Sequence, residues 1–383
     1  MHIYTEYLTS IRTLSIQIVS ESPSDEQTSV LVSPDGLSLK ASCHADVASV
    51  RLPVTLRGQD RGQSQTPDVP SAKLQYRFQV QAEHATISDG NAIIPWTATD
   101  LTDSLELTCK ICDTAVVSRD KVKQWKDLPS ENWAEMMDFW HCHKPNEPNT
   151  HDHATDEKGY AAQSRLTAQR AVGLVNATSF LLTAGDCSNV KSATSNSHAN
   201  SNDNEAILHC ASCNASIGTF DDATQSYKLA KLSLSLSHRP SGARQCFSPE
   251  LWLSCRLLNA VESQGLRKFT LLSSGPGDAL LIWIFTPDLY ISSSKGASAE
   301  PIRVAKVLWK YAPSAMDTPG SALDSQSLSE GEMEMPSFEL TAMEQYLERS
   351  SLLLPEHAGH LMGWNVGLLQ RFILEDIGTN RRY

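Results

Sequence analysis

Two Cys-x-x-Cys motifs, about 100 residues apart, constrain this chain more than any other feature. Cys109-Lys-Ile-Cys112 and Cys210-Ala-Ser-Cys213, named here the first and second knuckle, each follow a strand-like stretch and precede a predicted tight turn. This spacing lets two thiolates approach one metal ion while N–H groups of the turn donate to the sulfurs. The two knuckles together predict one structural zinc ion, bound by Cys109, Cys112, Cys210 and Cys213.

Two independent thiol pairs, either free or redox-active, are the alternative interpretation of the knuckles. A thioredoxin-type pair would begin a helix after a strand of a βαβ unit, and neither knuckle has that setting. A long insertion between the knuckles costs little closure entropy. Four cysteine ligands leave no open coordination position, so the ion would stabilise the fold and would not catalyse. We expect the site to join the front of the chain, its sheet-rich N-terminal part, to its rear, the mixed C-terminal part.

Composition limits the classes of function. The chain has 383 residues, 40% of them hydrophobic, and a net charge of -12 from 44 acidic and 32 basic side chains. This length indicates two or three domains, and the acidic balance argues against direct nucleic-acid binding and for a protein partner. No apolar stretch approaches the roughly 20 residues that span a bilayer, and a secretory signal pattern is not evident. We expect no membrane partner and a cytoplasmic and nuclear location.

The predicted fold class is α+β in three consecutive parts. Residues 1–100 form a β-rich domain, an antiparallel sandwich or open barrel, with strands at 28–33, 37–42, 47–56 and 74–81. Pro34-Asp-Gly36 is a turn between the first two strands, because Pro fixes φ and Gly accepts a positive φ. The polar stretch 58–70 is predicted to be a loop.

Residues 101–222 are predicted to form a zinc-knuckle module with a helical segment and disordered insertions. Ser130 is a suitable N-cap for a helix in which Trp133, Met136, Met137 and Trp140 share one face. That stripe is typical of a core rather than of a ligand groove. Residues 146–158 and 187–204 have the composition of insertions, and a second helix is expected within 160–182.

Residues 223–383 are predicted to form a mixed α+β domain. A strand is expected at 232–236, followed by a helix that Ser248 caps, Pro249 begins and Gly265 ends. Strands are expected at 268–273, 279–285 and 303–311, then a mobile loop at 313–336. Thr341 and Glu344 have the spacing of a capping box for a last helix.

Trp140-His-Cys-His-Lys-Pro145 is a candidate reactive site. Histidines on both sides of Cys142 would favour its thiolate when they are protonated, which makes Cys142 a candidate nucleophile. The same cysteine could contribute to a metal site, or lie half-buried beside the tryptophan stripe.

The final residues are a candidate partner-binding tail. Asn380, Arg381, Arg382 and Tyr383 combine an amide, a phenol and a terminal carboxylate, which a partner's metal site or pocket could accept. Polar chain ends are more often frayed.

The knuckles, the Trp133–Trp140 pattern leading into Cys142, and the final Asn-Arg-Arg-Tyr together resemble the HECT-like family of proteins that bind ubiquitin-conjugating enzymes. The resemblance covers most of the chain. It implies two partners: a ubiquitin-conjugating enzyme, and the metal-dependent endonuclease that cleaves pre-mRNA 3′ ends and whose active site a family member can block with its tail. It also implies a ubiquitin-accepting role for Cys142.

Two functions follow from this resemblance. The first is a binding protein that engages a ubiquitin-conjugating enzyme and inhibits the endonuclease through its tail. The alternative is a catalytic ubiquitin-protein ligase that forms a ubiquitin thioester on Cys142. An ordinary HECT ligase carries its thioester cysteine near the C-terminus, and here no cysteine follows Cys255. The binding function is therefore the first expectation.

Overall fold

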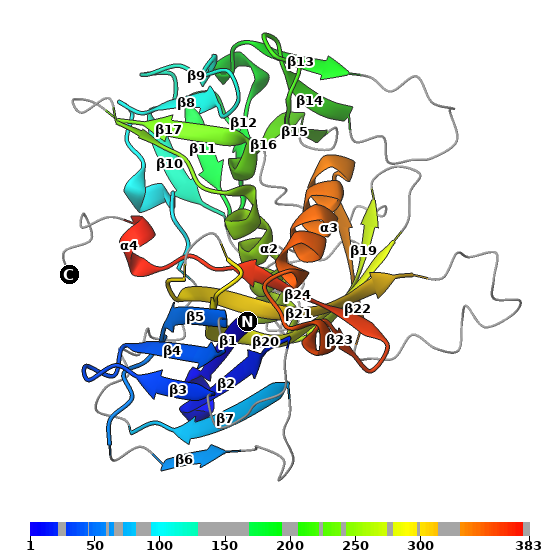
Figure 1. Ribbon diagram of the computed structural model, residues 1–383. Helices are drawn as coiled ribbons and strands as arrows, with labels where there is room; N and C mark the ends of the chain where they lie inside the picture. The colour runs from blue at the N-terminus through cyan, green and yellow to red at the C-terminus, as the bar shows by residue number, and fades with distance from the viewer. Residues whose placement is uncertain are drawn as a thin grey trace, which may run out of the picture. The chain divides into compact units, whose positions relative to one another are not determined.

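A computed structural model describes residues 1–21, 28–44, 46–58, 61–64, 72–81, 93–128, 168–193, 206–221, 225–238, 243–273, 279–296, 299–312 and 330–377. Over these residues the chain is β-rich (Figure 1), with the α-helices α2 (Pro249–Gln264), α3 (Ser337–Ser351) and α4 (Leu374–Ile377). The α+β class is therefore confirmed in its main feature. None of these helices is both long and apolar enough to cross a membrane.

The chain divides into two compact units, and each is described by itself. Unit 1 combines Met1–Ile93 with Arg267–Tyr383, and unit 2 is Ile94–Leu266. This division differs from the predicted boundaries at residues 100 and 222. The reason is strand pairing: β1 (His2–Leu8) pairs antiparallel with β20 (Leu280–Ser293), so both ends of the chain contribute to one sheet.

The main sheet of unit 1 has ten described strands, in the order β23-β24-β21-β20-β1-β2-β7-β6, with β19 paired to β20 and β22 paired to β19. Neighbouring strands are antiparallel except for β19 and β22, which run parallel. Besides β1 and β20, the strands are β2 (Thr13–Val19), β6 (Arg61–Ser64), β7 (Lys73–Gln79), β19 (Lys268–Ser273), β21 (Ile302–Tyr311), β22 (Glu330–Met335), β23 (His360–Leu361) and β24 (Trp364–Gln370).

A second, three-stranded sheet of unit 1 consists of β3 (Ser29–Val32), β4 (Ser38–Cys43) and β5 (Asp46–Arg51). The predicted turn before β4 is confirmed: Gly36 has φ 72°, and its N–H donates to the Ser33 carbonyl at 2.8 Å. Inward-facing residues of both sheets, among them Ile16 and Leu39, form one hydrophobic core. The alternation predicted at 74–81 supplies Leu74 and Val80 to that core.

Several local expectations were wrong, among them the predicted insertion 187–204, in which Val190–Ala193 forms a strand. Arg61–Ser64 lies within the predicted loop but pairs with β7, because strand pairing needs only backbone groups. Glu330–Met335 lies within the predicted mobile loop 313–336 but forms β22. The last helix begins at Ser337, after Pro336, and Thr341 donates to the Ser337 carbonyl instead of capping. Ser248 makes no side-chain capping bond, although α2 begins and ends as predicted.

Helix α3 covers one face of the main sheet. Met343 and Leu347 of the helix are fully buried, and a Cβ added to Gly367 in β24 would lie 2.7 Å from Leu347 Cδ2. The absence of a side chain at Gly367 therefore lets the helix approach the strand closely. This packing buries one face of β21 and β24, and the opposite face carries a second buried cluster that includes Leu308, Leu354 and Val366.

Unit 2 contains two sheets. The seven-stranded sheet has the order β10-β11-β12-β16-β15-β14-β13, and the four-stranded sheet has the order β18-β17-β8-β9. The first sheet is made of β10 (Gln124–Asp127), β11 (Val172–Val175), β12 (Ser179–Leu182), β13 (Val190–Ala193), β14 (Ala206–Cys210), β15 (Ser216–Asp221) and β16 (Ser226–Ala230). The second is made of β8 (Glu106–Cys109), β9 (Ala115–Val117), β17 (Leu234–Ser237) and β18 (Arg244–Gln245).

The described part of the stretch 160–182 is strand, not helix. Val172–Val175 and Ser179–Leu182 form an antiparallel pair joined by a tight turn. The Asn176 side chain accepts hydrogen bonds from the N–H groups of Thr178 and Ser179, at 2.8 and 2.9 Å, which stabilises the turn. Residues 180–182 are all buried, and continuous burial of this kind is typical of a central strand.

A fully buried lysine holds the core of unit 2 together. Lys231 Nζ donates to the carbonyl oxygens of Trp96 at 3.0 Å, Ala177 at 3.3 Å and Pro95 at 3.4 Å. It also lies 5.1 Å from the ring centroid of Phe180 and 5.4 Å from that of Trp252. Burial lowers the pKa of Lys231 to about 7. Its three donors satisfy three backbone carbonyls that belong to two separate segments.

Candidate metal centre

The two knuckles have the same local backbone structure. In the first, the Cys109 N–H donates to the Thr114 carbonyl at 2.8 Å and the Asp113 N–H to the Cys109 carbonyl at 2.9 Å. In the second, the equivalent bonds join Cys210 with Ala215 at 2.9 Å and Asn214 with Cys210 at 3.0 Å. Asp113 and Asn214 both adopt the left-handed conformation, at φ 60° and 62°, which short polar side chains tolerate.

The strands that carry the knuckles are irregular at equivalent positions. The pairing of β8 with β9 shifts register between Leu107 and Thr108, and the pairing of β14 with β15 shifts between Leu208 and His209. Each shift lies one residue before the first cysteine of its knuckle. Irregularities of this kind re-aim side chains, and each one precedes a knuckle whose thiols lie close to those of the other.

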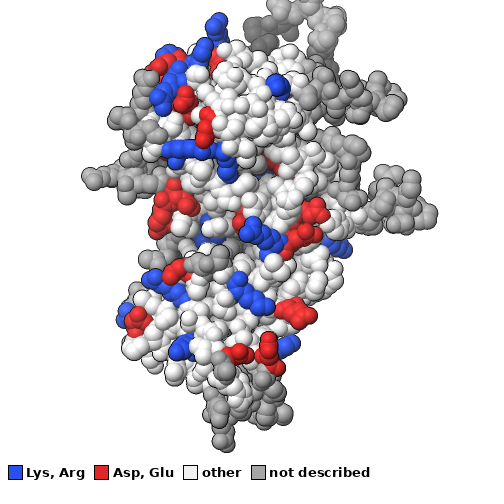
Figure 2. All heavy atoms as spheres, turned by 45° about the horizontal axis from the view of Figure 1, so that its top comes forward, with Lys and Arg blue, Asp and Glu red and all other residues white. Residues whose placement is uncertain are grey.

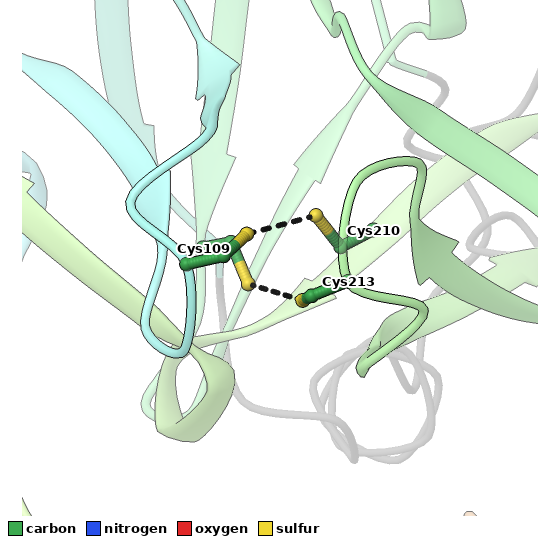
Figure 3. A group of neighbouring side chains, drawn as sticks. Cys109, Cys210 and Cys213 are labelled. Carbon is green, nitrogen blue, oxygen red and sulfur yellow. Dashed lines mark hydrogen bonds between the residues drawn. The ribbon is translucent and has the colours of Figure 1, made fainter.

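The four sulfurs converge into one cluster. The Sγ atoms of Cys109, Cys112, Cys210 and Cys213 all lie within 4.8 Å of one another. Cys109 and Cys213 are separated by 3.6 Å, as are Cys112 and Cys210, so each contact joins the two knuckles. Figure 3 shows the labelled thiols pointing toward one another from two facing loops.

The donor set fits a tetrahedral metal ion. Zinc–sulfur bonds of about 2.3 Å in a tetrahedron place the sulfurs about 3.8 Å apart, close to the two observed separations of 3.6 Å. A disulfide would require about 2.05 Å. Cys109 and Cys210 are buried, whereas Cys112 and Cys213 are partly exposed. The cluster therefore has an inner pair of thiols and an outer pair.

Backbone N–H groups and one hydroxyl stabilise negative charge on the sulfurs. The pKa of Cys112 is lowered to about 6, first by the Thr114 hydroxyl 3.2 Å away and then by the Thr114 N–H. Burial raises the pKa of Cys109 to about 12, although hydrogen bonds from the N–H groups of Cys112 and Ile111 lower it in part. A bound cation would reverse the effect of burial, because metal coordination deprotonates thiols.

Segments distant in sequence support the first knuckle. Arg244 donates to the Lys110 carbonyl at 2.7 Å and forms an ion pair of 2.6 Å with Asp113. The Lys110 N–H donates to the Ser233 carbonyl at 3.0 Å, two residues after the buried Lys231. In the second knuckle the Ala211 N–H donates in the same way to the Asn189 carbonyl, at 2.7 Å. Sequence analysis missed these supports, because no local pattern links Arg244 to Asp113.

His209 is beside the second knuckle but does not belong to the sulfur cluster. Its Nδ1 lies 3.1 Å from the Asn214 carbonyl, so the ring is hydrogen-bonded to the turn of its own knuckle. The metal-binding cluster found among the described residues contains four cysteines and no histidine. A site of this kind leaves no position for substrate or water. It can hold an ion and fix two sheets, but it cannot activate a substrate.

The structure corrects one expectation about the site. Both knuckles belong to unit 2, the first in the four-stranded sheet and the second in the seven-stranded sheet. The cluster therefore closes one unit, and the expected link between the front and the rear of the chain was wrong. The other predicted site residues, Cys142 and the tail Asn380, Arg381, Arg382 and Tyr383, lie outside the described residues.

The fold and the site define a β-rich protein with a closed four-cysteine cluster that could hold a metal ion. A sequence model of the family described as HECT-like ubiquitin-conjugating enzyme (E2)-binding matches residues 6–366. The chain belongs to this family.

Two fungal proteins of unstated function are similar to the chain. An uncharacterized protein of Saccharomyces cerevisiae is 27% identical over 299 residues, which cover 76% of this chain and 78% of that protein. An uncharacterized protein of Schizosaccharomyces pombe is 28% identical over 346 residues, covering 86% of this chain and 91% of that protein. No solved structure matches the chain.

Replacing one sulfur ligand should destabilise unit 2. Structural zinc in small domains contributes about 10–16 kcal/mol, so Cys109→Ser should cost on the order of 4 kcal/mol and lower the unfolding midpoint by about 10 °C. Cys246→Ser is the matched control, because Cys246 is an exposed free cysteine of the same unit. Calorimetry of both variants measures this difference. Equal midpoints for the two variants would contradict a metal-stabilised unit.

Proposed function

We propose that this chain is a zinc-stabilised protein that binds a ubiquitin-conjugating enzyme. The family match over residues 6–366 carries the proposal, because that family is described by its binding of such enzymes. The four-cysteine cluster supports the binding of zinc, since structural zinc prefers four thiolates close enough together to form a tetrahedron. The metal would fix the binding body and would take no part in chemistry.

Surface charge supports a protein partner over a nucleic acid. The net charge is -12. On the face drawn in Figure 2, basic and acidic side chains are interspersed. Nucleic-acid binding proteins instead present a concentrated basic surface that neutralises phosphates. A mixed surface is typical of the polar rim around a protein–protein contact.

The binding proposal is tested with a panel of purified ubiquitin-conjugating enzymes. Biolayer interferometry of the immobilised full chain should give saturable binding to at least one panel member. A ubiquitin-activating enzyme is the specificity control and should not bind. A folded, zinc-loaded chain that binds no member of the panel would end the proposal.

A catalytic ligase is the second candidate, and the family resemblance at Cys142 favours it. The Cys142 thiolate would attack the thioester carbonyl of the charged conjugating enzyme. The carbonyl carbon would leave the conjugating enzyme's cysteine and form a new thioester on Cys142, and the released thiolate would take up a proton. No oxidant or further reactant is needed. The residues around Cys142 lie outside those the structure describes.

Adduct formation separates the two candidates. The binding proposal expects no thiol-sensitive ubiquitin adduct on the chain, and equal conjugating-enzyme binding by wild type and Cys142→Ser. Non-reducing electrophoresis after incubation with charged conjugating enzyme measures the adduct. An adduct that forms on wild type and on Cys246→Ser, but not on Cys142→Ser, would establish the ligase instead.

A finer part of the proposal concerns the pre-mRNA 3′-end endonuclease, and only the resemblance at the tail supports it. The Asn380 amide and the Tyr383 hydroxyl offer oxygen ligands to the partner's metal site. Deletion of residues 380–383 should abolish inhibition of the purified endonuclease and leave conjugating-enzyme binding unchanged. Undiminished inhibition by the truncated chain would exclude the tail mechanism.

A further inference from the structure

One face of the main sheet in unit 1 carries three partly exposed aromatic rings. Trp283 lies 5.5 Å from Phe285 and 6.3 Å from Trp364, measured between ring centroids, and both contacts are edge to face. Phe285 is 40% exposed, and the two tryptophans are half-buried. The two tryptophans pack at the border of the buried cluster that includes Leu308 and Val366, and the remaining part of each ring is exposed. Tryptophan rings can bury up to 150–250 Å² each, so this border can bury further area against a partner.

Strand register places the rings on the face that points away from α3. Trp283 pairs with Leu308, which pairs with Val366 in β24, so these side chains share a face. The next residue of β21, Val307, pairs with Gly367, against which Leu347 of α3 packs. Successive residues of a strand point to opposite faces. The aromatic rings therefore lie on the face opposite to the helix.

Charged side chains surround the rings. Lys268 Nζ lies 4.9 Å from the Trp283 ring and Lys310 Nζ 4.5 Å from the Trp364 ring. The edge strand β22 contributes three exposed glutamates, Glu330, Glu332 and Glu334. They pair with Lys268, Thr270 and Leu272 of β19, so their side chains lie on the same face of the sheet as Lys268. We call this set of rings, lysines and glutamates the aromatic face.

The composition of the aromatic face matches that of a protein interface. Interfaces have an apolar centre enriched in tryptophan and a charged rim, and tryptophan dominates their binding energy. Aromatic rings beside lysines also occur where single-stranded nucleic acids stack. The row of three glutamates opposes that use, because it would repel phosphates within about 10 Å. Glu330 forms an ion pair of 3.7 Å with Lys268 of the same face. The exposed Glu332 beside it would complement a partner that presents lysine or arginine.

We propose that the aromatic face is the docking surface for the ubiquitin-conjugating enzyme, which contributes an apolar patch flanked by basic residues. This inference rests on the proposed function and assigns that function to a surface. The tryptophans supply contact area, and the glutamates set orientation and the rate of encounter. All the residues that define the aromatic face belong to unit 1.

The test compares variants of the full chain for binding to the conjugating enzyme that wild type binds best. Trp283→Ala should weaken binding about tenfold or more, as hot-spot tryptophans do. Glu332→Lys should weaken it several-fold, with a larger effect at low salt. Leu31→Ala is the matched control, because Leu31 is a 61% exposed apolar residue on the other sheet of unit 1 and should leave binding unchanged.

A second measurement does not depend on the stability of the tryptophan variant. The photo-crosslinker p-benzoylphenylalanine at position 285 should crosslink to the conjugating enzyme, and the same group at position 31 should not. Equal binding by wild type, Trp283→Ala and Glu332→Lys, with no crosslink from position 285, would overturn the docking surface while the proposed function stands. Wild type that binds no conjugating enzyme would overturn both. Binding of single-stranded RNA lost in Trp283→Ala would reassign the surface to nucleic acid.

Discussion

The meeting of four cysteine sulfurs within 4.8 Å is the constraint on which unit 2 depends. The first knuckle comes from a four-stranded sheet and the second from a seven-stranded sheet. Hydrogen bonds from Ser188 and Asn189 to the carbonyls of Val116 and Ala115 connect β9 to the segment before β13. A metal ion bound by the four sulfurs would add a second connection between the two sheets. The buried Lys231 links separate segments at a second place, because its Nζ donates to three carbonyls. Unit 2 is thus joined at two points, by the sulfur cluster and by the Lys231 amino group.

The sequence could predict the chemistry of the cluster, because thiolate ligands have a local pattern. Each knuckle repeats a spacing that brings two sulfurs to one ion, and the turn that follows needs a residue tolerant of positive φ, met by Asp113 and Asn214. The same local logic predicted Gly36 and the limits of α2. Local patterns could not predict partners across the chain. The pairing of Arg244 with Asp113 and of β1 with β20 depends on tertiary structure.

Two of the mistaken expectations have a common physical cause. Arg61–Ser64 and Glu330–Met335 are polar, and polarity alone predicts loops. Both are edge strands of the main sheet over the described residues, where backbone hydrogen bonds on one side suffice and polar side chains discourage aggregation. In the same way, the sequence could not place Trp283 and Trp364 side by side, since 80 residues lie between them in the chain and only the register of β20, β21 and β24 brings them together. The aromatic face therefore becomes visible only in the folded chain.

Native-state alkylation followed by mass spectrometry tests the sulfur cluster most directly. The protein, purified without chelator and treated with iodoacetamide while folded, should retain one zinc ion and leave Cys109, Cys112, Cys210 and Cys213 unmodified, while the exposed Cys246 reacts fully. A folded, metal-free chain in which all four cysteines are alkylated as readily as Cys246 would contradict the account.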